Sequence, residues 1–261
     1  MLSNAGNAPA PGPSAALPRP GVWLTDITLV LMALIWGVNF VVIKFATHVL
    51  PIVAFNAVRV SLAALALVIV GAVTGGPWPG RKQALTLIAL GILGNVIYQM
   101  LFVQGVAHTR ASDAAILIAA TPAFIAVLSR LRGAERVHRK VWGGIALSVL
   151  GIALISSAGM AGQSQSSLFG DLLVLGGAFC WALYSVLLKP HTHAVEGIKL
   201  GALTMVGGAV ALMVFAWPAV AAAPWSTAPP SAYWAIVYSG IGSLVIAYFF
   251  WYRGVRVIGP T

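Results

Sequence analysis

Charged side chains are scarce in this sequence. Only 8% of its 261 residues are Asp, Glu, Lys or Arg, whereas 60% are hydrophobic. A soluble domain normally carries about 25% charged residues, so this chain has too few polar side chains to cover a water-exposed surface of its size. The composition excludes an ordinary soluble protein and indicates that lipid surrounds much of the chain.

Acidic residues and cysteine are rarer still. Five acidic residues stand against fifteen basic ones, and Cys180 is the single cysteine. The basic residues lie between long apolar runs instead of on one soluble face, which argues against nucleic acid as a partner. One cysteine excludes a disulfide within the chain, and His191-Thr192-His193 is too weak a pattern for a metal site. We therefore predict no metal and no cofactor.

Sequence motifs for nucleotide binding and hydrolysis are also missing. The chain contains no G-x-x-x-x-G-K-[ST], no H-E-x-x-H and no G-x-S-x-G. These absences argue against an ATP-driven pump, a membrane protease and an esterase. We predict no catalytic residues and no enzyme activity. An intramembrane enzyme or lipid-handling protein is the alternative, and it would require an acid–base cluster at membrane depth.

Long apolar runs dominate the rest of the chain. A bilayer core about 30 Å thick is crossed by about 20 helical residues, and backbone groups in lipid must be hydrogen-bonded within their own segment. We expect an all-α integral membrane protein, a helical bundle with eight transmembrane helices, at 27–46, 52–73, 84–106, 112–131, 140–157, 170–188, 198–217 and 232–252.

The distribution of Lys and Arg predicts the orientation of these spans. Residues 1–25 are rich in Ala and Pro and lack the pattern of a signal peptide, so we expect a disordered cytoplasmic tail there. With the N-terminus inside, the opposite side carries only Lys44 and Arg110. The cytoplasmic side then carries Arg19, Arg81, Lys82, Arg130, Arg132, Arg136, Arg139, Lys140, Lys189, Lys199, Arg253 and Arg256. This asymmetry predicts a multi-pass protein of the cell membrane, plasma or bacterial inner, with a cytoplasmic N-terminus.

An internal repeat relates the two halves. Residues 33–44 (ALIWGVNFVVIK) align with 178–189 (AFCWALYSVLLK), and 91–106 (GILGNVIYQMLFVQGV) align with 240–255 (GIGSLVIAYFFWYRGV). The repeat unit holds five spans, so the second copy enters the membrane in the opposite direction. Inverted repeats that meet at a midplane cavity are typical of secondary transporters.

The repeat also divides the chain into domains. We expect a first five-helix repeat at 26–158, an outer loop at 159–169, and a second repeat at 170–261 that is incomplete, with three helices. A full second copy would add two spans, for ten in all. A truncated, inactive or partner-completed fragment is therefore a further alternative, and whether the chain ending at Thr261 functions alone stays open.

Polar and aromatic residues recur at helical spacing within the apolar spans. Trp36, Asn39 and Phe40 share a face, as do Trp181, Tyr184 and Ser185, and the repeat pairs Gln99 with Tyr248 and Phe102 with Trp251. Such groups either line a watery cavity or join helices by hydrogen bonds. As a recurring set we expect them to bind substrate: Trp36, Asn39, Asn95, Tyr98, Gln99, Trp181, Tyr184 and Tyr248.

Arg59 is the one basic residue placed well inside a span. A central arginine costs about 2.5–3.5 kcal/mol on insertion scales. It could hold a substrate carboxylate, pair with Asp113, or cap carbonyl groups at the outer side. We include Arg59 among the candidate substrate-binding residues.

The order of several segments resembles one family. Residues 31–46 (LMALIWGVNFVVIKFA), 51–60 (PIVAFNAVRV), 120–155 (ATPAFIAVLSRLRGAERVHRKVWGGIALSVLGIALI) and 170–189 (GDLLVLGGAFCWALYSVLLK) are similar to the EamA-type branch of the drug/metabolite transporter superfamily. The resemblance implies ten helices in two inverted repeats, a central cavity, and export or exchange of amino acids or related metabolites. This chain would lack the last two helices. The implied partners are the lipid bilayer and a small-molecule metabolite, and a homodimer stays open.

Overall fold

The structure of the protein is a computed structural model that describes residues 22–132, 143–144, 146–147, 150–151 and 168–257. Every regular element in these ranges is a helix. Seven segments there are long and apolar enough to cross a membrane: Trp23–Val49, Ile52–Val73, Arg81–His108, Ala111–Leu131, Leu168–Thr192, Gly197–Ala221 and Pro230–Val257. These match seven of the eight predicted spans. The eighth, 140–157, lies mostly outside the described residues.

The first two spans are single helices joined by a short turn. Helix α1 (Val22–Val49) begins two residues after Pro20, so residues 22–25 of the predicted tail belong to a helix. Pro51 precedes α2 (Ile52–Val73), where proline is tolerated because the first helical N–H groups have no partner within the helix. The antiparallel pair places the C-terminal end of α1 beside the N-terminal end of α2.

The third span changes its helical winding at mid-membrane. It consists of α3 (Arg81–Ile92), the π-helical segment η1 (Leu93–Ile97) and α4 (Tyr98–His108). The last span has the same construction, with α10 (Pro230–Val237), the π-helical η3 (Tyr238–Ile246) and α11 (Ala247–Val257). π-Helical turns are rare in proteins overall, but those that occur inside α-helices are often found at functional sites. These two segments therefore indicate that a functional site lies in the bundle interior.

The fourth span is broken near its centre. Helix α5 (Ala111–Ile118) ends and α6 (Thr121–Leu131) starts with Pro122 in its first turn. Pro122 lacks a backbone N–H and cannot continue the preceding helix. The fourth span is therefore interrupted directly before this proline.

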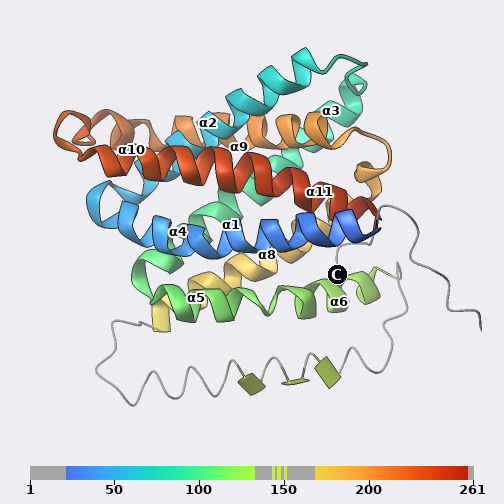
Figure 1. Ribbon diagram of the computed structural model, residues 1–261, viewed down its shortest axis with the longest axis horizontal. Coiled ribbons are helices and arrows are strands. Elements are labelled where there is room, and N and C mark those ends of the chain that lie inside the picture. The colour runs from blue at the N-terminus through green and yellow to red at the C-terminus, as the bar shows by residue number, and fades with distance from the viewer. Residues whose placement is uncertain (1–21, 133–142, 145, 148–149, 152–167, 258–261) are drawn as a thin grey trace, which may run out of the picture.

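The second half of the chain packs closely against the first. Helix α8 (Leu168–Thr192) lies against α4 and α6, and α9 (Gly197–Ala221) lies against α2 and α3. Figure 1 shows α11 beside α1 and α2 beside α9. A short 3-10 turn, η2 (Trp225–Thr227), connects α9 to α10. The interior enclosed by α1, α2, α4, α8 and α11 holds the candidate site.

Candidate functional site

A cavity of about 570 Å³ occupies the centre of the bundle. Its walls come from α1, α2, α4, α5, α6, α8, η3 and α11, so both halves of the chain contribute. A volume between about 300 and 1,000 Å³ suits a small-molecule site. The residues that line it are mostly apolar, with a few polar side chains at defined positions.

Aromatic rings form one continuous wall of this cavity. The ring of Trp181 lies 6.0 Å from Trp36, 4.9 Å from Tyr98, 5.4 Å from Tyr248 and 4.8 Å from Trp251, measured between centroids. Edge-to-face and tilted contacts of this kind are the favoured arrangements of aromatic side chains. Trp36 is further fixed by its indole N–H, which donates to the carbonyl oxygen of Ser243 at 3.1 Å. The wall is therefore rigid and presents flat apolar surfaces.

Arg59 places a positive charge on the lining of the cavity. Its side chain is 1% exposed, and its Nε, Nη1 and Nη2 atoms donate to Asn56 Oδ1 at 3.0 Å, Ser239 Oγ at 2.7 Å and Gln99 Oε1 at 2.7 Å. Its guanidinium carbon lies 5.4 Å from the centroid of the Phe55 ring. All of these partners are neutral. In the described part of the chain no carboxylate contacts Arg59, and Asp113 bonds to Ser112 instead.

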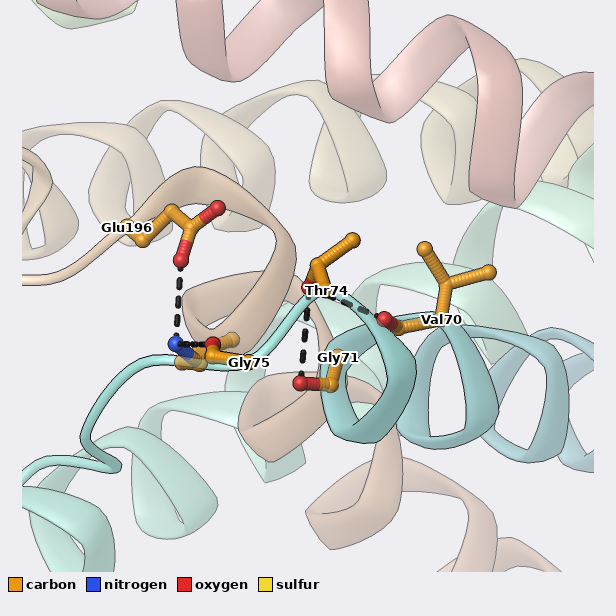
Figure 2. Close-up of polar contacts among 6 residues, drawn as sticks. Val70, Gly71, Thr74, Gly75 and Glu196 are labelled. Carbon is orange, nitrogen blue, oxygen red and sulfur yellow. Dashed lines mark hydrogen bonds and ion pairs between the residues drawn. The ribbon is translucent and has the colours of Figure 1, made fainter.

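Lys199 offers a comparison within the same protein. It is also 1% exposed, but its Nζ donates to the carboxylate of Glu196 at 3.1 Å and to the carbonyl oxygen of Gly75. Figure 2 shows Glu196 and Gly75 on two sides of this one nitrogen, beside the end of α2. Lys199 does not line the central cavity. The buried lysine is thus neutralised by a structural partner, whereas the buried arginine on the cavity has no acidic partner among the described residues.

Asn39 contributes a second polar feature to the cavity. Its side chain is 3% exposed, and its Oδ1 atom has no hydrogen-bond partner among the described residues. A buried acceptor that lacks a partner costs free energy, on the order of 1–3 kcal/mol. A ligand with an N–H group would satisfy this oxygen.

The structure brings seven of the nine predicted site residues to one cavity. The lining includes Trp36, Asn39, Arg59, Tyr98, Gln99, Trp181 and Tyr248. Gln99 Nε2 also donates to the hydroxyl of Tyr248 at 3.5 Å, while its Oε1 accepts from Arg59. The amide of Gln99 is thus bonded to one residue from each half of the chain.

Asn95 and Tyr184 lie outside this lining. Asn95 donates to the carbonyl oxygen of Thr204 on α9 at 3.1 Å, and the Tyr184 hydroxyl bonds to that of Tyr252 at 3.3 Å. Asn95 and Gln99 are four residues apart and would share a face of a regular α-helix. The π-helical segment η1 adds a residue to the turn between them, so their side chains point in different directions. A substrate contact by either residue stays a prediction, and neither residue lines the cavity.

Other polar residues of the site were not singled out from the sequence. Asn56 and Ser239 hold Arg59, and Ser243 holds Trp36 through its backbone. Asn56 is a polar side chain within an apolar span, so the rule that identified Asn95 and Gln99 would also have found it. Serine is common in membrane helices, and only the three-dimensional contacts distinguish Ser239 from its neighbours.

The cavity is closed at one end and extends toward the other. It follows α1 from Phe40 back to Leu29 and follows η3 and α11 from Ser243 to Val255. Beyond Phe40, the rings of Phe40 and Phe102 meet at 5.3 Å. Past these rings, Lys44 on α1 donates to the carbonyl oxygens of Ala107 and Thr109 at 2.8 and 2.7 Å. The closed end is therefore the end where α1 stops and α2 starts.

Comparison with known proteins gives consistent matches along the chain. The EamA-like transporter family matches residues 23–157 and 168–261. YyaM, an uncharacterized transporter of Bacillus subtilis, is 28% identical over 90% of this chain and 78% of its own length. An uncharacterized transporter of Archaeoglobus fulgidus is 31% identical over 91% of this chain and 82% of its own.

Two further matches are a relative named as an exporter and a solved crystal structure. The probable terminal-alkyne amino-acid exporter of Streptantibioticus cattleyicolor is 29% identical over 85% of this chain and 73% of its own. A crystal structure with 17% identity covers 90% of this chain and 79% of its own, with a TM-score of 0.60. That structure is similar in fold alone.

Proposed function

Because this chain belongs to the EamA-like transporter family, we propose that it is a secondary transporter that exports amino acids or related small metabolites by alternating access. The observation that carries this proposal is the central cavity with Arg59 on its lining and neutral side chains around it. The family and the transporter-named relatives point to transport rather than to an enzyme.

The lining residues fit the functional groups of an amino acid. A guanidinium binds a carboxylate through two parallel N–H bonds, and Arg59 has no carboxylate partner among the described residues. Asn39 lines the cavity and its Oδ1 has no hydrogen-bond partner among the described residues, so an amino group that reaches this oxygen would satisfy it. Trp36, Trp181 and Tyr248 offer flat surfaces to an apolar side chain. The name of the Streptantibioticus cattleyicolor relative supports this substrate class.

Contacts between equivalent positions support an inverted repeat. The sequence repeat aligns Trp36 with Trp181, and their rings meet at 6.0 Å. It also aligns Gln99 with Tyr248, which are joined by a hydrogen bond. Residues related by an approximate twofold axis meet when they lie near that axis, and transporters with inverted repeats bind substrate there. Alternating access would then exchange the closed end of the cavity for the open one.

The side to which the cavity opens can be tested by cysteine labelling. With the N-terminus inside, as the basic residues predict, the cavity opens to the cytoplasm, because it extends along α1 toward the helix start. In a Cys180→Ala background, Ala33→Cys on the lining is expected to react with a membrane-impermeant maleimide in inside-out vesicles and to stay unlabelled in intact cells. Val41→Cys is the matched control, since Val41 is 64% exposed on α1 but does not line the cavity. Labelling of Ala33→Cys from outside alone would contradict the orientation.

Transport itself is tested with the purified chain in liposomes. Vesicles preloaded with an unlabelled amino acid or related carboxylic acid are expected to accumulate the labelled compound by exchange, well above protein-free vesicles, for at least one member of a broad panel. Failure to move any member, under proton, sodium or substrate gradients, would remove the support for an exporter.

A further inference from the structure

A second, smaller cavity of about 200 Å³ lies at the end of the bundle where α8 and α11 stop and α9 starts. It shares no lining residue with the central cavity. Its charged residues are Glu196, Arg253 and Arg256. The proposed transport function assigns no role to these three residues or to this cavity.

The charge balance of this small cavity is positive. Arg256 is exposed and has no hydrogen bond or ion pair with another described residue, and Arg253 uses only its Nε, which donates to Thr25 Oγ1 at 3.4 Å. The carboxylate of Glu196 lies 3.1 Å from Lys199 Nζ and is already balanced by this one cation. Figure 2 draws the ion pair as the dashed line at Glu196. Both arginines are therefore available to an anion.

The start of α9 adds to this positive potential. Gly197 and Ile198, the first residues of this 25-residue helix, line the cavity, and no side chain caps their backbone N–H groups. Free N–H groups at a helix start carry partial positive charge and bind phosphate or carboxylate groups. They reinforce the two arginines without forming a site by themselves.

Part of the lining of this cavity is apolar. Phe249 is 44% exposed, and it lies on α11 within the last segment that is long and apolar enough to cross a membrane, so we expect its exposed face to contact lipid. Ile198 and Leu200 continue this apolar surface inside the cavity. The cavity thus has a basic part at the helix ends and an apolar part that includes the exposed ring of Phe249.

We propose that this cavity binds an anionic phospholipid, with its phosphate between Arg253 and Arg256 and the start of its acyl chains along Phe249. Basic cavities between membrane helices bind phospholipid headgroups because they offer charge and hydrocarbon together. A soluble phosphate ion would use the arginines but leave the apolar wall without a partner. The lipid binds at a site separate from the transported substrate and stabilises the contact of α8, α9 and α11.

Thermal unfolding of the purified, delipidated full-length protein tests this proposal. Phosphatidylglycerol is expected to raise the melting temperature by about 5 °C at saturating concentration, because a ligand that binds only the folded state stabilises it. Phosphatidylcholine with the same acyl chains, inorganic phosphate and glycerol phosphate are expected to give less than a third of this shift. The Arg253→Gln/Arg256→Gln variant is expected to lose most of the phosphatidylglycerol shift.

Matched variants make the result decisive. Arg81→Gln/Lys82→Gln removes two exposed charges from the start of α3 and is expected to keep the full shift. If the double arginine variant does not fold, Arg256→Gln alone removes an exposed side chain without a described partner and is expected to lose at least half of the shift. An equal shift in the cavity and control variants would overturn the proposal. If phosphatidylcholine raised the melting temperature as much as phosphatidylglycerol, the headgroup charge would have no role. If inorganic phosphate did so, the acyl chains would have none.

Discussion

Arg59→Gln is expected to reduce exchange of carboxylate-bearing substrates by about 30-fold or more while leaving the folded protein intact. Truncating one member of a buried, hydrogen-bonded charge pair typically costs about 2–5 kcal/mol of binding, which corresponds to roughly 30-fold or more in affinity. The loss arises because Asn56, Gln99 and Ser239 offer no second cation to replace Arg59. Exchange of labelled substrate in liposomes measures the effect, with flux and apparent affinity determined separately.

Stability distinguishes a functional Arg59 from a structural one. A buried arginine is costly in the membrane interior, but its removal also takes the donor from Asn56, Gln99 and Ser239. The two effects oppose each other, so the melting temperature is expected to change little. Arg59→Lys keeps the charge but not the paired N–H geometry and is expected to restore part of the activity. Arg81→Gln, which removes an exposed charge outside the cavity, is the control. Wild-type exchange by Arg59→Gln, or a loss of exchange that merely follows a fall in melting temperature, would contradict the role assigned to Arg59.

Gly91→Val is expected to destabilise the bundle more than any other single change considered for this protein. A Cβ atom on Gly91 would lie 2.0 Å from the carbonyl oxygen of Thr204 and within 2.9 Å of two further backbone atoms of that residue. The obstacle is the backbone of α9, which no side-chain rotation can remove. Helices α3 and α9 would have to separate, and the bond from Asn95 to Thr204 would be lost with them.

The cost of this separation is large enough to measure. Overpacking of a filled interior costs about 1–3 kcal/mol or more, which for a chain of this length lowers the melting temperature by about 2–12 °C. Accumulation in the membrane and thermal unfolding in detergent report the change. Gly37→Val is the matched control, because a Cβ at Gly37 meets no heavy atom within 4 Å. Equal stability of the two variants would show that α3 and α9 do not approach as closely as described.

The positions of the membrane helices could be predicted from the sequence because each helix satisfies its own backbone hydrogen bonds. Hydropathy then marks where each span lies without knowledge of its neighbours, and the bounds of the seven observed spans agree with the predicted ranges to within a few residues. The break before Pro122 has an equally local cause, because proline lacks the backbone N–H that a continuous helix requires.

The candidate site was only partly predictable, because helix rotation depends on neighbouring helices. Gln99 and Asn95 are both amides in one apolar span, yet only Gln99 lines the cavity. The π-helical turn between them rotates Asn95 toward α9, where Gly208 leaves room for its Cβ. Tyr184 similarly fills the space that Gly94 leaves. These small-residue contacts lie far apart in sequence, so no periodicity within one helix reveals them.

The sequence by itself determined that this protein is built from membrane helices. It also identified Arg59 as a charged residue inside a span, and therefore as a candidate functional residue. Both results follow from the cost of placing polar groups in lipid, a cost that each residue carries wherever its neighbours are. Only the tertiary structure decided that Arg59 faces the central cavity among neutral partners while Lys199 is neutralised by Glu196. Which partner a buried charge meets depends on how the helices pack against each other, and that depends on contacts between both halves of the chain.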